Sequence, residues 1–292
     1  MREWVDERQT KAMLEHSYEI SSRDWESTIS VDRNAIEDKS LSSLNSVNSG
    51  KPLGGNPEPS PLWEGAETIG RLSKEELAYS LLLGDGYLSP LTNGSKNSRL
   101  YFVQSIKHKD YVDWIAELCS RFWKVKRFKR EVGCGFNNKR FIQYGFRTSV
   151  YPFFTHLRKK VFYPENRKRI NQRILSKLTP FSLAVWFMDD GSLRKQKGSR
   201  RFILCTGGYT IKENYLIKDF FLRKFGIKWR ISFMRKTQPF LHCGVREGLK
   251  FVKLIKPFIV PSMRYKINLN YQMLNKSSLK AEILQVYPEY KI

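Results

Sequence analysis

Two apolar runs of this chain end alike, each with an aspartate followed by a glycine. The runs cover residues 78–86 and 183–191, and their aspartates are Asp85 and Asp190. A carboxylate at the C-terminal end of a helix meets carbonyl groups that already carry partial negative charge, so such a place favours a bound cation. The paired runs therefore predict two helices whose ends together bind divalent metal ions.

Helix boundary signals flank both runs. Ser73 with Glu76 three residues later is typical of a capping box, and Thr179 followed by proline is typical of a helix start. Gly86 and Gly191 follow the two aspartates, where helices commonly end on a left-handed glycine. We therefore expect two helices of about three turns, each closed by a glycine in the left-handed conformation.

The alternation of apolar and polar positions repeats after each run, which indicates a duplicated unit. Strands are expected at 99–105, 125–132 and 140–148 in the first half, and at 201–207, 228–235 and 239–245 in the second. Further helices are expected at 110–123 and 154–164, and at 212–225 and 251–261. The pattern predicts an α+β fold made of two similar halves.

Composition separates the N-terminal segment from the rest of the chain. Residues 1–66 hold 7 Lys and Arg against 12 Asp and Glu, whereas the whole chain carries a formal charge of +24. Residues 40–61 are rich in Ser, Asn, Gly and Pro, which is linker composition. We predict an acidic extension with its linker at 1–66, a first half at 67–175 and a second half at 176–292.

The basic charge of the two halves limits the classes of function. Such a field attracts polyanions, and counterion release would drive binding to nucleic acid. An anionic membrane or a ribosomal-type role is the alternative, but the composition favours nucleic acid. The four cysteines lie far apart without CxxC spacing, which argues against disulfides and structural zinc. Because no apolar stretch approaches about 18 residues, we expect no membrane partner. A reducing, intracellular compartment fits best.

The chemistry depends on how closely the two motif helices pack. Ser80 and Gly84 give the first helix a face of small residues, and the second helix carries Asp189 opposite, without an evident partner. Close packing would bring Asp85 and Asp190 together. These carboxylates, with backbone oxygens at Gly84 and Asp189 and with DNA phosphates, would form the all-oxygen site that Mg²⁺ prefers. Such a site suits metal-assisted phosphodiester hydrolysis.

The chain resembles the LAGLIDADG homing endonucleases in their single-chain, two-motif form, and the resemblance covers about residues 70–275. Residues 178–191 and 254–267 carry it most clearly, and they look like the subgroup of the yeast mitochondrial large-rRNA intron endonuclease. The resemblance implies two pseudo-symmetric αββαββα halves that form a saddle-shaped DNA-binding surface. It also implies a monomer that uses Mg²⁺, or Mn²⁺ in its place, to break both strands of a long asymmetric target. The break would promote intron homing.

The resemblance also implies further active-site residues. A lysine from the far end of each half would lie near the scissile phosphate, and Lys266 matches this place in the second half. In the first half the spacing of the family favours Lys168, whereas alignment of the two halves favours Arg169; we predict Lys168. Gln104 matches a residue that helps to order water in the active site. The second half has Thr206 and a glycine there instead, so the two sites are expected to be unequal.

The remaining basic and polar residues on or beside the strands are candidates for DNA contacts. Alternate side chains of a strand share one face, so a curved sheet from each half could lie in the major groove. Most contacts of this kind reach phosphates rather than base edges. The run 195–201 is expected to be a loop that flanks the groove. The candidates are Arg99, Gln143, Arg147, Lys195, Lys197, Arg200, Arg201, Arg230 and Arg235.

Two other functions remain open. The chain could be an intron maturase, with the same fold bound to intron RNA to assist splicing, or a non-enzymatic DNA-binding protein on this scaffold. The presence of both Asp85 and Asp190 favours the nuclease. The extension at 1–66 is explained by an exon-fused reading frame or by a partner contact. An intein is disfavoured because no splicing residues open or close the chain. The expected location is a mitochondrion or plastid, with the bacterial cytoplasm as the alternative.

Overall fold

The chain is described here by a computed structural model. It describes residues 69–91, 95–133, 140–196, 199–269 and 279–290. The predicted extension and Lys197 lie outside these residues, so the predicted domain boundaries stay predictions. None of the described helices is long and apolar enough to cross a membrane.

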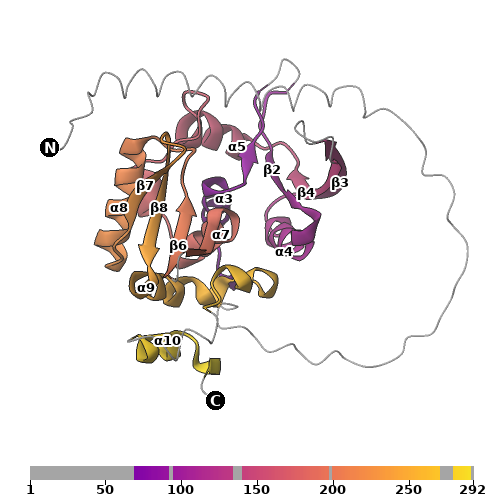
Figure 1. Ribbon diagram of the computed structural model, residues 1–292. Coiled ribbons are helices and arrows are strands. Elements are labelled where there is room, and N and C mark those ends of the chain that lie inside the picture. Colours follow the sequence, from indigo (N-terminus) through magenta and orange to yellow (C-terminus); the bar gives the residue numbers. More distant parts are fainter. Residues whose placement is uncertain (1–68, 92–94, 134–139, 197–198, 270–278, 291–292) are drawn as a thin grey trace, which may run out of the picture. The chain divides into compact units, whose positions relative to one another are not determined.

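Both predicted motif helices are present, as α3 (Lys74–Leu83) and α7 (Pro180–Asp190). The Ser73 side chain accepts a hydrogen bond from the Glu76 N–H at the start of α3, and Thr179 forms a capping box at the start of α7. Most residues of both helices are buried. The helices pack side by side between the two sheets (Figure 1), so their C-terminal ends meet at the junction of the halves.

The conformation of the two motif glycines differs from the prediction. Gly86 has a negative φ and Gly191 is extended (φ −86°, ψ 153°), whereas the described glycine with a positive φ is Gly226. Close packing explains the glycines instead. A Cβ atom on Gly86 would lie 2.3 Å from the Leu81 carbonyl oxygen, and one on Gly191 would lie 2.2 Å from Cδ2 of Phe187. The chain turns sharply after each helix, and only glycine leaves room for that turn.

Each half contains one four-stranded antiparallel sheet. The first has the order β1-β2-β4-β3 and the second has the order β5-β6-β8-β7. The first sheet consists of β1 (Tyr87–Leu88), β2 (Leu100–Ser105), β3 (Val125–Gly133) and β4 (Arg140–Thr148). The second consists of β5 (Gly191–Gln196), β6 (Ser199–Cys205), β7 (Arg230–Met234) and β8 (Gln238–Gly244). The matching orders confirm the predicted duplication, although the alternation of the sequence does not predict β1 and β5.

The run 195–201, predicted as a loop, is largely a hairpin. β5 extends to Gln196 and β6 begins at Ser199, with Arg194 paired to Arg201 and Lys195 paired to Arg200. Consecutive charged residues hide the alternation of apolar and polar positions in this segment, so its strands cannot be recognised from the pattern. The loop is therefore much shorter than predicted.

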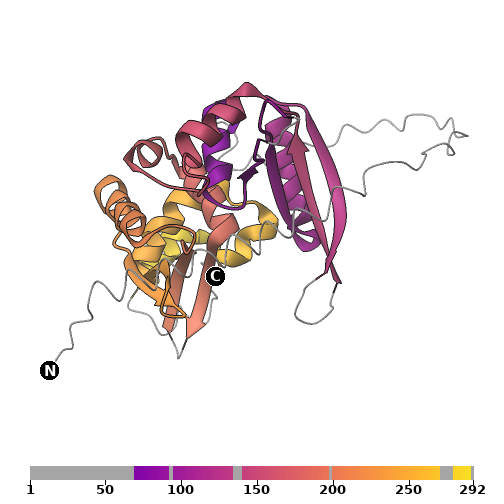
Figure 2. The same ribbon diagram turned by 90° about the horizontal axis from the view of Figure 1, so that it is seen from above.

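Helices cover one face of each sheet. α4 packs on the first sheet (Figure 2), and α8 and α9 pack on the second. The helices after α3 in the first half are η2 (Ile106–His108), α4 (Lys109–Ser120), α5 (Pro152–His156), the π-helical turn η3 (Leu157–Phe162) and α6 (Gln172–Ser176). Those after α7 are α8 (Ile211–Phe225), α9 (Val245–Ile255), η4 (Lys256–Phe258), η5 (Pro261–Lys266), α10 (Lys280–Val286) and η7 (Pro288–Tyr290).

The alternation of side chains divides each sheet into a core face and a free face. Phe102 of β2 is buried and contacts Tyr111 of α4, while Phe202 of β6 is buried against Phe187 and Gly248. Side chains one residue away along these strands point to the opposite face. Arg147 of β4 and Arg201 of β6 lie on these free faces.

Candidate active site

The two aspartates lie at the paired ends of the motif helices. Asp85 follows α3 directly, and Asp190 is the last residue of α7. Burial, followed by the negative charge of Asp85, raises the pKa of Asp190 to about 7. Burial also raises the pKa of Asp85, although Lys168 and Gln104 oppose the shift. The two carboxylates thus repel each other electrostatically in a poorly solvated place, where a bound cation would relieve the repulsion.

One lysine from each half lies at a helix end. Nζ of Lys168 donates to the carbonyl oxygens of Gly84 at 2.6 Å and Gly86 at 3.0 Å. Nζ of Lys266 donates to the carbonyl oxygens of Met188 and, at 3.0 Å, Asp189. Burial lowers the pKa of both lysines, and the three nearby aspartates oppose this shift. The structure brings each predicted lysine beside a predicted carboxylate.

The neighbours of Lys168 in the sequence point elsewhere. Arg167 forms an ion pair with Glu213 at 2.8 Å. Nε of Arg169 is buried without a hydrogen-bond partner in the described part of the chain. Of the three basic residues in this run, Lys168 is the one that reaches the end of α3.

Gln104 lies between two of the carboxylates. Its Nε2 donates to Oδ2 of Asp85 at 2.5 Å and to Oδ1 of Asp189 at 3.5 Å. The corresponding Thr206 of the second half is buried and bonds to the side chain of Asn214 instead. The inequality expected from the sequence is therefore present in the geometry.

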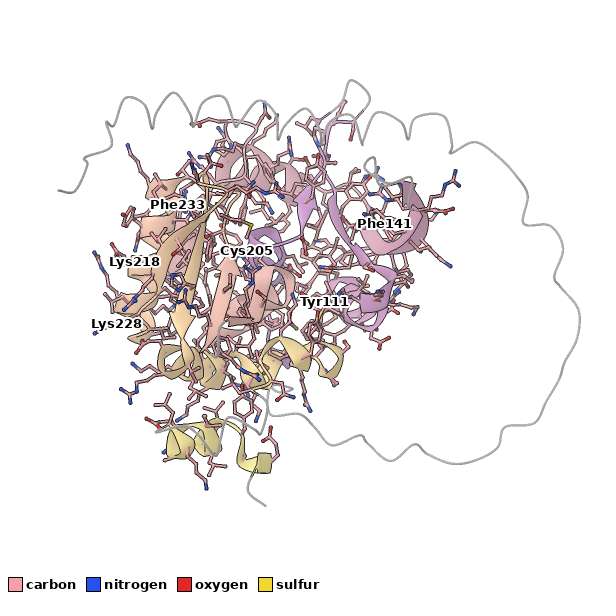
Figure 3. The ribbon with its side chains drawn as sticks, viewed as in Figure 1. Tyr111, Phe141, Cys205, Lys218, Lys228 and Phe233 are labelled. Atoms are coloured by element: carbon pink, nitrogen blue, oxygen red, sulfur yellow. The ribbon has the colours of Figure 1, made fainter. Side chains whose placement is uncertain are left out.

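Asp189 has partners that the sequence does not reveal. Its carboxylate accepts from the N–H of Asp85 at 3.1 Å and from the hydroxyl of Tyr111 at 2.9 Å. Tyr111 belongs to α4 of the other half and is labelled in Figure 3. A Cβ atom on Gly84 would lie only 2.3 Å from Oδ2 of Asp189, so this glycine makes room for the carboxylate. Asp189 thus connects the two halves. Tyr111 could not be predicted from the sequence, because a tyrosine at this position is equally well explained as part of the apolar face of its helix.

The donor set suits a hard divalent cation. Oδ2 of Asp85 accepts from Gln104 and Oδ2 of Asp190 accepts from Nε1 of Trp186, and the second oxygen of each carboxylate has no hydrogen bond among the described residues. The carbonyl oxygens of Gly84 and Asp189 lie at the same helix ends, where each also accepts from a lysine ammonium group. No cluster of three His, Cys, Asp or Glu side chains that could hold a metal occurs in the described part. Metal ligands from the protein would therefore be two carboxylates and backbone oxygens, completed by water or phosphate.

The predicted DNA contacts of the first half share the free face of their sheet. Arg147 pairs with Tyr101 and Gln143 pairs with Ser105, and all four positions alternate with the buried Phe102. Arg99, two residues before Tyr101, has the same parity. Lys126 and Arg130 pair with Arg147 and Gln143 and were missed, although the alternation of β3 could have identified them.

On the second sheet the strand register separates neighbouring arginines. Arg201 pairs with Arg194 on the free face, whereas Arg200 occupies the same side as the buried Phe202. A shallow pocket of the free face is lined by Arg194, Arg201, Ile203, Phe240 and His242. Arg230 pairs with His242 on this face, and Arg235 lies in the turn after β7. The sequence prediction did not distinguish Arg200 from Arg201 and omitted Arg194 and His242.

Comparison with known proteins agrees with the fold. The two motif helices, the paired sheets and the carboxylates at the helix ends define a duplicated protein with a shared acidic centre. A family model described as LAGLIDADG DNA endonuclease family matches residues 76–251. The chain belongs to this family.

Individual relatives differ in their names and lengths. The chain is 30% identical over 210 residues to the cytochrome b mRNA maturase bI2 of Debaryomyces hansenii, which covers 68% of this chain and 76% of that protein. It is 26% identical over 209 residues to protein RecA of Mycolicibacterium flavescens, covering 68% of this chain. The alignment spans only 47% of that RecA protein.

A solved structure supports the fold alone. The homing endonuclease I-WcaI bound to its DNA recognition sequence superimposes with a TM-score of 0.61 and 22% sequence identity, covering 73% of this chain and 96% of that one. A second family model, described as Mu-like prophage major head subunit gpT, matches residues 1–51. Those residues lie outside the described part of the chain.

Proposed function

We propose that the protein is a site-specific homing endonuclease that hydrolyses one phosphodiester bond in each strand of a DNA duplex. The observation that carries this proposal is the pairing of Asp85 and Asp190 at adjoining helix ends, each with a lysine beside it. A protein that only binds DNA has no need for carboxylates in a place where they repel both each other and the phosphates.

The residues of the chain would divide the work of hydrolysis. When bound, Mg²⁺, or Mn²⁺ in its place, would supply activated water and stabilise the leaving oxygen. Asp85 and Asp190 would hold it, together with the carbonyl oxygens of Gly84 and Asp189. Lys168 and Lys266 would place positive charge where the phosphates become more negative. Gln104 would orient Asp85 and nearby water in the first half only.

The free faces of the two sheets support binding to a long, asymmetric duplex by one protein molecule. They carry Arg147 in the first half and Arg194 and Arg201 in the second, and their different side chains would give each half-site its own contacts. The similar fold of I-WcaI, which was solved with its DNA recognition sequence, is consistent with this role. Most of these contacts would reach phosphates, and a few would read bases in the major groove.

The match of residues 1–51 suggests the host gene. This segment is similar to a phage head-subunit family rather than to a nuclease, which supports an exon-fused reading frame. The target we propose is the uninterrupted head-subunit gene near the position where the match ends, and cleavage there would promote homing. A prophage setting favours the bacterial cytoplasm over a mitochondrion or plastid.

The direct test uses a plasmid that carries the head-subunit coding sequence rejoined across this reading frame. Purified protein is incubated with it in Mg²⁺, with EDTA and the Asp190→Asn variant as controls. A single Mg²⁺-dependent double-strand cut near the junction is expected. Tight binding without a cut would overturn the endonuclease and leave a DNA-binding protein on the same fold.

A second candidate function is intron maturation. The relative that favours it is the cytochrome b mRNA maturase bI2, at 30% identity. The same basic faces could bind intron RNA and assist its splicing. Splicing of the chain's own intron RNA, with and without the protein, distinguishes this role, and an unchanged splicing rate would exclude it.

A further inference from the structure

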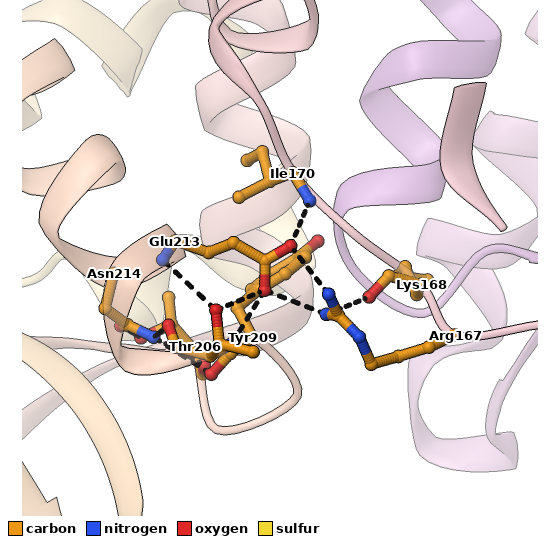
Figure 4. A network of polar contacts seen from close by, with 8 residues as sticks. Arg167, Lys168, Ile170, Thr206, Tyr209, Glu213 and Asn214 are labelled. Carbon is orange, nitrogen blue, oxygen red and sulfur yellow. Dashed lines mark hydrogen bonds and ion pairs between the residues drawn. The ribbon is translucent and has the colours of Figure 1, made fainter. Parts of the chain in front are cut away.

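The segment that carries Lys168 is held by an acid from the other half. Arg167 donates from Nη1 to Oε2 of Glu213 at 2.8 Å and from Nη2 to Oε1 at 3.3 Å (Figure 4). The N–H of Ile170 donates to the same Oε1 at 3.0 Å. Arg167 also donates to the carbonyl oxygen of Lys168 at 3.0 Å. The Arg167 side chain before Lys168 and the Ile170 N–H after it are therefore tied to a single carboxylate.

Glu213 is built to remain charged in this position. It is 7% exposed, and the N–H of Thr210 donates to its Oε2 at 2.7 Å in the capping box of α8. Burial raises the pKa of Glu213, but the bonds from Arg167, Thr210 and Ile170 outweigh it and lower the pKa overall. A capping box alone would not require a buried charge, because Thr179 and Ser182 form one at α7 without an acid.

The same turn also supports the end of α3. The hydroxyl of Tyr209 donates to the carbonyl oxygen of Leu83 at 2.9 Å, one residue before the Gly84 carbonyl that Lys168 binds. Residues 209–213 of the second half thus fix both the lysine segment and the helix end that it meets.

We propose that Glu213, acting through Arg167, is a positioning residue for Lys168. A residue of the second half would thus fix the position of the lysine ammonium group in the active site of the first half. This inference rests on the proposed endonuclease function. It predicts that the two strands of the target depend unequally on Glu213.

The segment of Lys266 is held in a different way. The hydroxyl of Tyr287, from the same half, donates to the carbonyl oxygen of Ile267. Tyr265 stacks on His108 of the other half with ring centroids 6.4 Å apart, and it is 57% exposed. Among the contacts of the described residues, no carboxylate binds groups on both sides of Lys266.

The test measures the cleavage rate of each strand separately, on end-labelled target duplex at saturating protein. Lys168→Met first identifies the strand that Lys168 serves. Glu213→Gln keeps the size of the side chain but removes its charge and replaces one accepting oxygen with a donating NH2 group. We expect it to slow that strand by about 10-fold to 100-fold, a typical cost of losing a positioning partner, and to leave the other strand nearly unchanged. Nicked DNA should accumulate, with KM unaffected.

Glu247→Gln is the matched control. Glu247 also accepts a backbone N–H, from Lys228 at 2.6 Å, and a lysine side chain, but it lies in the first turn of α9 and bonds to neither active-site lysine. The Glu247→Gln variant should cut the two strands with the wild-type ratio of cleavage rates. Arg167→Lys should keep part of the cleavage rate that Arg167→Met loses. In the double variant, Glu213→Gln should cause no further loss of cleavage rate beyond that of Lys168→Met.

If Glu213→Gln slowed both strands equally, so that the ratio of their cleavage rates stayed unchanged, the positioning role of Glu213 would be overturned. If the wild-type protein cuts no DNA, the proposed function fails. The positioning of Lys168 by Glu213 is then tested by NMR of the lysine ammonium groups. The Lys168 signal should then lose its protection from exchange in Glu213→Gln while the Lys266 signal keeps it. Equal protection of the Lys168 signal in the wild-type protein and in Glu213→Gln would refute the positioning role of Glu213.

Discussion

The two halves share one order of elements, yet they support their active-site residues differently. In the first half, Asp85 is tied through its N–H to Asp189, and Lys168 is tied through its segment to Glu213. Both supports come from the second half. In the second half, Asp190 bonds to Trp186 of its own helix. Asp85 and the Lys168 segment are therefore held from across the junction, whereas Asp190 is held within its own half.

This difference shows how a duplicated fold produces unequal sites. Duplication preserves helices, strands and the Asp-Gly ends, because these are encoded within each half. Contacts across the junction involve one residue from each half, so a change on one side alters only one site. Gly84 and Asp189 illustrate this, since the glycine of one helix makes room for the carboxylate of the other.

The largest effect is expected from the acids themselves. Asp85→Asn or Asp190→Asn should lower double-strand cleavage at least about 100-fold, because each removes a charge that would hold the metal. DNA binding should change little, since the phosphate contacts remain. Gel-based cleavage and binding assays on one target would check both outcomes. Normal cutting by either variant would refute the two-aspartate site.

Replacement of the lysines should separate the two sites. Lys168→Met and Lys266→Met are each expected to slow cleavage by about 100-fold, and each should affect mainly one strand, the opposite strand in the two cases. Strand-specific end labels would measure this. If both variants slowed the same strand, the assignment of one lysine to each site would be incorrect.

Packing at the helix ends should be sensitive to a single methyl group. Gly84→Ala places Cβ within 2.3 Å of Oδ2 and 2.5 Å of Cβ of Asp189, so we expect a loss of roughly 1–3 kcal/mol in the free energy of unfolding. Gly208→Ala is the control, because a Cβ there meets nothing within 4 Å. Denaturant unfolding of both variants would measure the difference, and equal stability would show that the helices are not in close contact.

The charge of Glu213 gives the stability a defined pH dependence. Bonds from Arg167, Thr210 and Ile170 outweigh burial and hold the pKa of Glu213 below its ordinary value of 4.5. The stabilisation is therefore present above that value and is lost as pH falls below it. Glu213→Gln should cost roughly 1–3 kcal/mol at neutral pH, and the gap to wild type should close in acid. A gap that stays constant down to pH 3 would contradict the charged state.

The smallest effect is expected at Tyr111. Tyr111→Phe removes a donor to Asp189, which should cost about 1 kcal/mol of unfolding free energy. Tyr144→Phe is the matched control, because its hydroxyl bonds to Asp113 at 2.8 Å in a more exposed place. It should cost less. Equal losses in thermal melts would mean that the Asp189 contact contributes no more than a surface bond.

Much of the fold follows from local patterns in the sequence. The motif helices, their caps and the strands β2, β3, β4, β6, β7 and β8 were predicted because periodicity and capping residues act over short distances. β1 has only two residues, and β5 is masked by consecutive charges, so neither has a clear alternation. The glycines were assigned the wrong conformation because a glycine after a helix is usually left-handed. Here glycine is required instead because a Cβ atom would clash with Leu81 or Phe187 of the preceding helix.

The site could be predicted only in part. Asp85, Asp190, Lys168 and Lys266 were named from the sequence, and the structure brings them together, while their catalytic roles stay predictions. The partners of Asp189 and the Glu213 contact could not be found, because they join residues from different halves. Likewise, the different faces of Arg200 and Arg201 became clear only from the pairing register of the strands.

The most direct test of the central claim is a strand-resolved cleavage assay on the rejoined head-subunit gene in Mg²⁺, comparing the wild-type protein with Asp190→Asn. The account predicts one double-strand break near the junction for the wild type and none for the variant, with equal DNA binding by both. Binding without cleavage by the wild type, or equal cleavage by the variant, would contradict it.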